Sequence, residues 1–311
     1  MSRRTPRNRA QRDLDRPARE RYATRSLTFE IGGDTCRGTL YLPSGTPDPP
    51  VVVMGPELGA DRSFGLPAVA ERFAAAGYAA FRFDYRGFGD SGGSDRRIAP
   101  VHHREDYDAA VDRVRRIDDL GPGVALYGSG LGALHALRAA SDRRDVDAVL
   151  AITPLLDGRA LLRRRAAKPF LAAMATGVRD ATIGRLGGGR TVPIVGGEAD
   201  RAVLTDPGAK RGYLDLVDRE STWRNETPAR SLVSLARARL GDRIEDVHAP
   251  TLMLAGDRDA LAPEPAVESA ADRLPSSTYV RMPADHWSVY GADFEPAVGH
   301  QIAFLRDAFD A

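Results

Sequence analysis

Cysteine and long apolar runs are scarce in this chain of 311 residues, and each scarcity excludes a class of protein. The single cysteine, Cys36, cannot form an internal disulfide, and we interpret it as a small residue of an early strand rather than as a catalytic thiol. No apolar run approaches the roughly 18 to 20 residues that a membrane helix needs, and no apolar stretch follows the positive charges near the N-terminus. The sequence therefore predicts a cytoplasmic protein without a membrane span or a secretory signal.

Lysine is also scarce, because Lys168 and Lys210 are the only two and arginine carries nearly all the positive charge. Residues 1–24 are dense in arginine and almost free of large apolar side chains, which predicts a flexible arm. Asp13 and Asp15 interrupt the positive run, and the formal net charge of the whole chain is only +1. We therefore expect neither a nucleic-acid partner nor a membrane partner, and the sequence leaves a homodimer open.

Strand and helix patterns alternate through most of the remaining chain. "RSLTFEI" and "TCRGTLYLP" alternate with a period of two around the turn "GGDT", as in an antiparallel hairpin. Continuous apolar runs such as "PPVVVMG" then alternate with amphipathic patterns such as "LPAVAERFAAAGY" and "REDYDAAVDRVRRI". This order predicts an α/β fold with a mostly parallel central sheet and helices on both faces.

The alternation is interrupted once. Residues 25–154 and 246–311 form the predicted core, whereas residues 155–245 contain short helical patterns and the glycine-rich stretch "GGGRTVPIVGGEAD". Open α/β sheets bind ligands at the carboxyl edge of their strands. We therefore interpret residues 155–245 as a mainly helical lid over that edge.

Two residues at the ends of late strands suit acyl-transfer chemistry. Asp259 follows the strand in "LMLAGDRDALAP", and His286 follows the next strand in "MPADHWSVYG". An acid that orients a histidine, in this chain order and after a nucleophile, is the arrangement of a hydrolase triad. Asp259 alone is equally typical of a turn or a helix N-cap, and His286 alone of a surface loop. Their joint placement favours the catalytic interpretation.

The predicted nucleophile turn is anomalous. "GVALYGSGLGALHAL" has the outline of a strand, a sharp glycine turn and a helix, but alignment with G-x-S-x-G places Gly130 at the nucleophile position. Using Ser129 instead would put Tyr127 and Leu131 where the turn needs small residues. We expect Ser129 to face away from His286, which leaves an enzyme without the nucleophile or one that uses a neighbouring group.

Stretches such as "ERFAAAGYAAFRFDYRGFGDSGG", "AGDRDALAPEPAV" and "DHWSVYGADFEPAVGHQIAFLRDAF" resemble the α/β-hydrolase superfamily. The resemblance covers nearly all of residues 26–311 and is most specific to the branch of dienelactone hydrolases and of polyketide transferases and thiohydrolases. It implies an α/β-hydrolase fold, with Asp259 as the acid and His286 as the histidine.

The chain departs from that family at two positions. Gly130 replaces the nucleophile, and Pro56 and Glu57 replace the His-Gly pair before the oxyanion hole in "VVVMGPELGADRS". The family's backbone donors align with Leu58 and Leu131, so an oxyanion hole survives both changes. A carboxylate beside a ligand cleft is costly unless it is paired or useful, although a solvent-facing loop glutamate would explain Glu57 equally well.

Four aromatic residues are candidates for an apolar substrate pocket: Trp287, Tyr290, Tyr213 and Trp223. Ordinary packing would explain each of them alone. The other histidines are interpreted as structural, with His102 and His103 placed just before a helix start and His135 within the helix after the turn. No metal or organic cofactor is expected, because the sequence shows no ligand cluster or phosphate-cradling loop.

Without a serine nucleophile, a positioned base and an oxyanion hole suit proton abstraction beside a carbonyl. The sequence therefore favours a lyase of polyketide-type metabolism that eliminates a carboxylate such as acetate from an ester-bearing small molecule. His286 would be the base, Asp259 its orienter, and Glu57 a second acid/base or a substrate contact. One alternative is an esterase, thioesterase or acyltransferase that uses Ser129 or water activated by His286. Another is a ligand-binding protein without catalysis.

Overall fold

The computed structural model describes residues 21–310 except residues 94, 165–166, 184–188 and 219–220. Eight strands form one sheet in the order β1-β2-β4-β3-β5-β6-β9-β10. Their bounds are β1 Tyr22–Ile31, β2 Asp34–Pro43, β3 Val51–Gly55, β4 Ala79–Phe83, β5 Val124–Ser129, β6 Ala148–Ile152, β9 Thr251–Gly256 and β10 Ser277–Met282. Strands β1 and β2 pair antiparallel, as do β2 and β4, and the other pairs are parallel. The predicted hairpin and the predicted parallel core are both confirmed.

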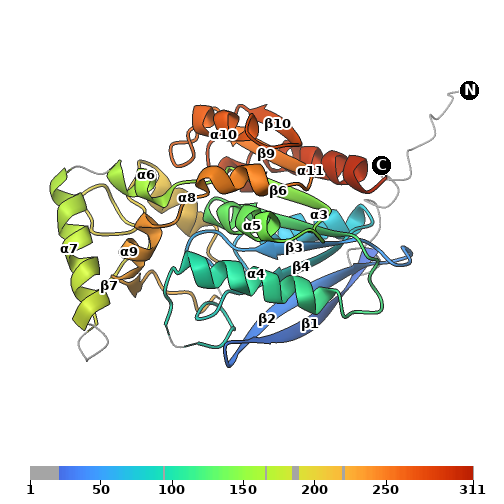
Figure 1. Cartoon of the computed structure of the whole chain (residues 1–311), viewed down its shortest axis with the longest axis horizontal. Coiled ribbons are helices and arrows are strands. Elements are labelled where there is room, and N and C mark those ends of the chain that lie inside the picture. Colours follow the sequence, from blue (N-terminus) through green and yellow to red (C-terminus); the bar gives the residue numbers. More distant parts are fainter. Residues whose placement is uncertain (1–20, 94, 165–166, 184–188, 219–220, 311) are drawn as a thin grey trace, which may run out of the picture.

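Helices cover both faces of the sheet (Figure 1). The helices of the core are α3 Leu66–Ala75, α4 Pro100–Val114, α5 Leu131–Asp142, α10 Glu264–Ala271 and α11 Phe294–Phe309. Helices α4, α5 and α10 contribute to the larger hydrophobic core, which also contains Val51 and Val53. Helices α3 and α11 contribute to the core on the other face, with Val52 and Met54. Because alternate residues of β3 enter opposite cores, its continuous apolar sequence is explained by burial on both faces.

Helix α4 begins earlier than the sequence predicts. The predicted start was Arg104, but the helix begins at Pro100, whose fixed φ suits the first turn of a helix. His102 and His103 therefore lie inside the first turn, and their predicted placement before the helix is wrong. His103 is buried and stacks on Tyr85 with ring centroids 4.3 Å apart. The apolar pattern of the helix begins only after this turn, which is why the sequence misplaced its start.

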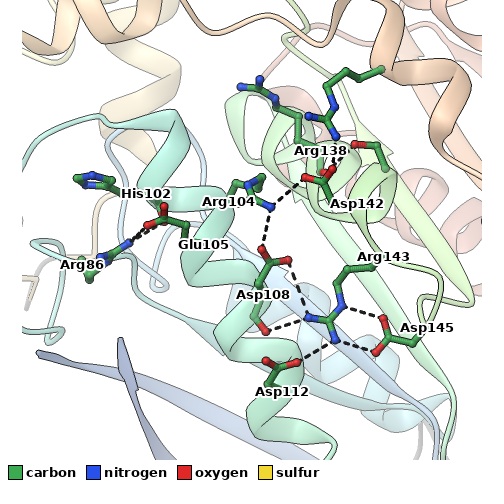
Figure 2. Close-up of polar contacts among 12 residues, drawn as sticks. Arg86, His102, Arg104, Glu105, Asp108, Asp112, Arg138, Asp142, Arg143 and Asp145 are labelled. Carbon is green, nitrogen blue, oxygen red and sulfur yellow. Dashed lines mark hydrogen bonds and ion pairs between the residues drawn. The ribbon is translucent and has the colours of Figure 1, made fainter. Parts of the chain in front are cut away.

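Ion pairs join the outer surfaces of α4 and α5 (Figure 2). Arg104 contacts Asp108 one turn later at 3.0 Å and Asp142 of α5 at 2.9 Å. Arg143, directly after α5, contacts Asp112 at 2.9 Å and also lies beside Asp108. Such partly exposed pairs contribute about 0–1 kcal/mol each. The network therefore stabilises the packing of α4 against α5 only through the sum of several weak pairs.

Most of the segment between β6 and β9 lies at one end of the sheet (Figure 1). Its elements are α6 Gly158–Arg163, α7 Ala167–Ile183, β7 Thr191–Val192, α8 Ala209–Asp215, β8 Thr227–Pro228, α9 Ser231–Ala236 and the 3-10 helix η2 Gly241–Asp246. The glycine-rich stretch that was expected to be irregular contains β7, which pairs antiparallel with β8. No described helix is long and apolar enough to cross a membrane.

Candidate active site

The turn between β5 and α5 has the strained backbone of a sharp elbow. Gly130 occupies this turn with φ 51° and ψ −118°. A Cβ on Gly128 would lie 2.2 Å from the carbonyl oxygen of Gly132, and a Cβ on Gly132 would lie 2.6 Å from that of Pro56. Both flanking positions therefore require glycine, because the start of α5 lies too close to the end of β5 and to the carbonyl of Pro56 for a side chain to fit.

The side chain of Glu57 points into this elbow. Its Oε1 accepts hydrogen bonds from the backbone N–H of Leu58 at 2.7 Å and of Leu131 at 2.9 Å. These are the two groups that the sequence predicted as oxyanion-hole donors, so they do converge on one point, and a carboxylate oxygen occupies it. Glu57 is only 7% exposed, so the interpretation as a solvent-facing loop glutamate is wrong.

Gly130 leaves the space that this carboxylate fills. A Cβ on Gly130 would lie 1.8 Å from Oε2 of Glu57 and 2.1 Å from Oε1. Real Cβ atoms essentially never approach another atom below 3.0 Å. A side chain at position 130 and Glu57 in this conformation therefore exclude each other, and the two departures that the sequence analysis noted are one structural change.

Asp259 and His286 lie at the ends of β9 and β10, where the sequence placed them. Nδ1 of His286 and Oδ2 of Asp259 are 2.7 Å apart. The other oxygen of Asp259 accepts the backbone N–H groups of Leu261 and Ala262 at 2.7 and 2.8 Å. Asp259 thus both caps its turn and orients the histidine. His286 is 3% exposed, so it is not a surface-loop histidine.

Glu57, His286 and Asp259 form a chain of charged contacts. Nε2 of His286 lies 3.4 Å from Oε2 of Glu57, on the side opposite Asp259. Burial alone would lower the pKa of His286, but the carboxylates of Asp259 and Glu57 outweigh burial and raise that pKa to about 10. One carboxylate therefore lies at each nitrogen of the imidazole, and both favour its protonated form.

Ser129 lies beside this chain rather than at its end. It is 1% exposed, and its Oγ donates to Oε2 of Glu57 at 3.4 Å. The hydroxyl of Tyr290 also hydrogen-bonds Ser129, while burial raises the pKa of Tyr290 to about 12. Ser129 is thus a neighbour of Glu57, and its described side-chain contacts place it in the wall of the site.

Two of the predicted pocket aromatics tie the segment between β6 and β9 to the loop after β3. The hydroxyl of Tyr213 donates to the carbonyl of Leu58, and Nε1 of Trp223 donates to that of Gly59, both at 2.8 Å. Trp287 contacts the rings of both Tyr213 and His286, with centroids 5.5 and 4.7 Å apart. Tyr213 and Trp223 thus hold the backbone directly after the donor N–H of Leu58.

A buried tyrosine that no sequence pattern singled out aligns the two strands of the site. The hydroxyl of Tyr107 in α4 accepts the N–H of Gly55 at 2.9 Å and donates to the carbonyl of Tyr127. It therefore joins the strand before Glu57 to the strand before Gly130. An aromatic residue in an amphipathic helix is an ordinary core pattern, so no sequence signal distinguished it.

The remaining candidates lie outside this arrangement. Cys36 is fully buried, and burial raises the pKa of its thiol to about 12, which is inconsistent with a reactive thiolate. His103 and His135 face each other with ring nitrogens 3.3 Å apart, and burial lowers the pKa of both. Among the described residues, no group of three or more metal-ligating side chains is suited to hold a metal ion.

The chain is similar to known proteins in sequence and in fold. The family described as serine aminopeptidase, S33, matches residues 59–283. The quorum-quenching protein AidA of Acinetobacter baumannii is 31% identical over 285 residues, which cover 90% of this chain and 93% of AidA. Two solved structures share the fold. DcsB in complex with a substrate analogue has a TM-score of 0.81 and 22% identity, covering 92% of this chain and all of DcsB. The α/β hydrolase GrgF from a Penicillium species has a TM-score of 0.80 and 19% identity, covering 93% of this chain and all of GrgF.

The matched residues run from the loop that carries one backbone donor to the strand before His286, and so include the elbow and Asp259. The match ends before His286 and begins after Glu57, and the order of the strands is that of the α/β-hydrolase fold expected from the sequence. The chain belongs to the S33 serine aminopeptidase family of α/β hydrolases.

Proposed function

We propose that this protein is a hydrolase in which Glu57 takes the place of the serine nucleophile. The observation that carries the proposal is the position of its carboxylate, with Oε1 on both backbone donors and Oε2 facing His286. A nucleophilic oxygen beside a histidine, next to an oxyanion hole, is the arrangement that covalent hydrolysis requires. Gly130 makes room for it, since any side chain at that position would collide with the carboxylate.

The charge state of the site suits a carboxylate nucleophile. An anionic Glu57 needs no base to activate it, unlike a serine hydroxyl. The protonated His286, held by Asp259, is an acid rather than a base in the resting site. It is therefore ready to donate a proton to an oxygen leaving group that departs near Oε2.

These properties favour a substrate whose electrophilic carbon is saturated and carries an oxygen leaving group, such as a small epoxide. Attack on an acyl carbon would give a mixed anhydride, whereas attack on a saturated carbon gives an ordinary ester. In the first step Oε2 of Glu57 bonds to the carbon, the carbon-oxygen bond of the epoxide breaks, and the alkoxide takes the proton of His286. The product is a hydroxyalkyl ester of Glu57 and a neutral imidazole.

The same groups complete the second step. Esterification removes the charge of Glu57, so the pKa of His286 falls and the neutral imidazole becomes a base. His286 then takes a proton from water as the hydroxide attacks Cδ, and the oxyanion forms at Oε1, where Leu58 and Leu131 already donate. Collapse expels the alcohol with a proton from His286, and proton transfer from the acid back to His286 restores the resting charges. The net reaction adds one water and gives a diol.

Elimination with His286 as the base stays a prediction of the sequence, and the geometry favours it less. Both donors that would hold an enolate are bound to Glu57, and His286 already carries the proton that it would have to abstract. A mechanism through Ser129 would likewise need Glu57 to leave, because Ser129 contacts the carboxylate. Covalent catalysis by Glu57 uses each group in its present place.

The test is to trap the ester in a His286→Gln variant, in which ring opening is slowed because the alkoxide must take its proton from water, and attack by water on the ester lacks its base. The variant is incubated with styrene oxide and with 1,2-epoxy alkanes of increasing length, and intact-protein mass spectrometry follows. We expect the protein to gain the full mass of one epoxide, with fragmentation placing it on Glu57, and a Glu57→Gln/His286→Gln control to gain nothing. Absence of an adduct, together with absence of diol formation by the wild type across the panel, would contradict the proposal.

A further inference from the structure

A cavity of about 400 Å³ lies beside α6 and is lined mainly by arginine. Its lining residues are Asp157, Arg159, Ala160, Arg163, Arg164 and Arg239. Four positive side chains therefore face one negative side chain. This concentration of charge contrasts with a formal net charge of +1 for the whole chain.

Backbone pairing holds the two sides of this arginine cavity in place. Asp157 and Arg239 form an antiparallel bridge, flanked by hydrogen bonds from Gly158 N to Ala238 O at 2.9 Å and from Leu240 N to Leu156 O at 3.0 Å. Arg159 and Arg163 are one helical turn apart on α6, so their side chains lie on the same face. Paired backbone thus fixes the positions of Asp157 and Arg239, while the arginine side chains that line the cavity are exposed.

The charge in the arginine cavity is only partly balanced. Arg239 pairs with Asp157 and Arg164 pairs with Asp206, each at 3.2 Å. Within the described residues, Arg159 and Arg163 have no ion pair with an acidic side chain. Two guanidinium groups therefore remain available to an anion.

The arginine cavity is close to the catalytic elbow along the backbone. The N–H of Leu155 donates to the carbonyl of Gly130 at 2.9 Å, and Asp157 in the cavity wall follows two residues later. Helix α6 begins at the next residue and lies at the end of the sheet that the inserted segment occupies (Figure 1).

We propose that the arginine cavity binds the phosphate group of an organic phosphate. Guanidinium groups bind phosphate through paired hydrogen bonds, and a dianion gains more from two unpaired arginines than a single carboxylate does. The volume exceeds that of one phosphate, so it accommodates the adjoining organic part of the ligand as well. This binding site does not depend on the chemistry proposed for Glu57.

Isothermal titration calorimetry tests the proposal with phenyl phosphate and inorganic phosphate as probes. The variants are Arg159→Ala/Arg163→Ala and, as a control on α8 of the same inserted segment, Arg211→Ala, whose side chain is 90% exposed. We expect the wild type to bind phenyl phosphate more tightly than inorganic phosphate, with an affinity that falls as salt rises. Loss of two charge-assisted contacts should weaken binding by about tenfold or more in the double variant, and Arg211→Ala should bind as the wild type does.

Three results would overturn the proposal. They are no heat of binding to the wild type at millimolar phenyl phosphate, equal affinity in the double variant, and equal weakening by Arg211→Ala. Tighter binding of inorganic phosphate than of phenyl phosphate would overturn the claim that the cavity also holds the organic group of the ligand. Circular dichroism checks that the double variant is folded. Its spectrum should match that of the wild type, because Arg159 and Arg163 are exposed.

Discussion

The mutual exclusion of Glu57 and a side chain at position 130 predicts a strong energetic coupling between the two positions. In Gly130→Ala the new Cβ would meet the carboxylate at 1.8 Å, so Glu57 must leave its place. The variant then loses two hydrogen bonds to a charged group, each about 1.5–3 kcal/mol, and leaves His286 without one partner. Backbone strain at φ 51° adds about 1–3 kcal/mol.

In a Glu57→Ala background the same glycine substitution costs only the backbone strain, because the colliding carboxylate is gone. If the losses of the two single variants simply added, the double variant would have a certain free energy of unfolding. We expect the measured value to be higher than that by about 3 kcal/mol, at the upper end of couplings measured between contacting residues. Urea denaturation of the wild type, both single variants and the double variant measures this coupling. Gly299→Ala is a matched control, because no atom lies within 4 Å of its new Cβ and it should stabilise α11 slightly.

Additive effects within about 0.5 kcal/mol would refute the reasoning. They would mean that Glu57 does not occupy the elbow in solution. The proposals about the nucleophile would then lose their structural basis.

Four further predictions concern the surroundings of the carboxylate. Glu57→Gln should lower the pKa of His286 from about 10, which NMR titration of the ring protons measures; an unchanged pKa would contradict the contact. Because this pKa lies above the ordinary value of about 6.5, the stability it contributes should be complete below pH 6.5 and lost as the pH rises towards 10, as thermal melts against pH would show. Tyr213→Phe removes the hydrogen bond to the carbonyl of Leu58, so it should lower the free energy of unfolding in urea by about 1 kcal/mol and lower kcat severalfold. A change in KM alone would contradict a role of Tyr213 in positioning the backbone at Leu58. Ser129→Ala should retain turnover, and the wild type should take up no fluorophosphonate; a stoichiometric adduct lost in the variant would restore serine chemistry.

The sequence predicted the sheet and the ends of its strands, because their signals are local. The continuous apolar run of β3 follows from burial of both its faces. The alternating pattern of β1 follows from burial of one face only. Asp259 and His286 follow successive parallel strands, whose carboxyl ends share one edge, so their proximity could be inferred without coordinates.

What could not be predicted depends on side-chain direction and on contacts between distant segments. Nothing local indicates that Glu57 turns into the elbow, because the space it fills is left by a glycine, Gly130, in a different strand-helix unit. The hydrogen bond from Tyr213 to Leu58 spans 155 positions and depends on how the inserted segment folds back. Helix α4 begins before its amphipathic pattern does, so the periodicity of the sequence could not predict its first turn.

A single turnover in water enriched in the heavy oxygen isotope tests the central claim most directly. Enzyme in excess over an epoxide that it hydrolyses is quenched after one cycle, and the peptide that contains Glu57 is weighed. Attack of water on Cδ of the ester predicts that the heavy oxygen appears in the Glu57 carboxylate and that the first diol carries none. Heavy oxygen in the diol with an unlabelled Glu57 would mean that water attacks the substrate directly, and the carboxylate would not be the nucleophile.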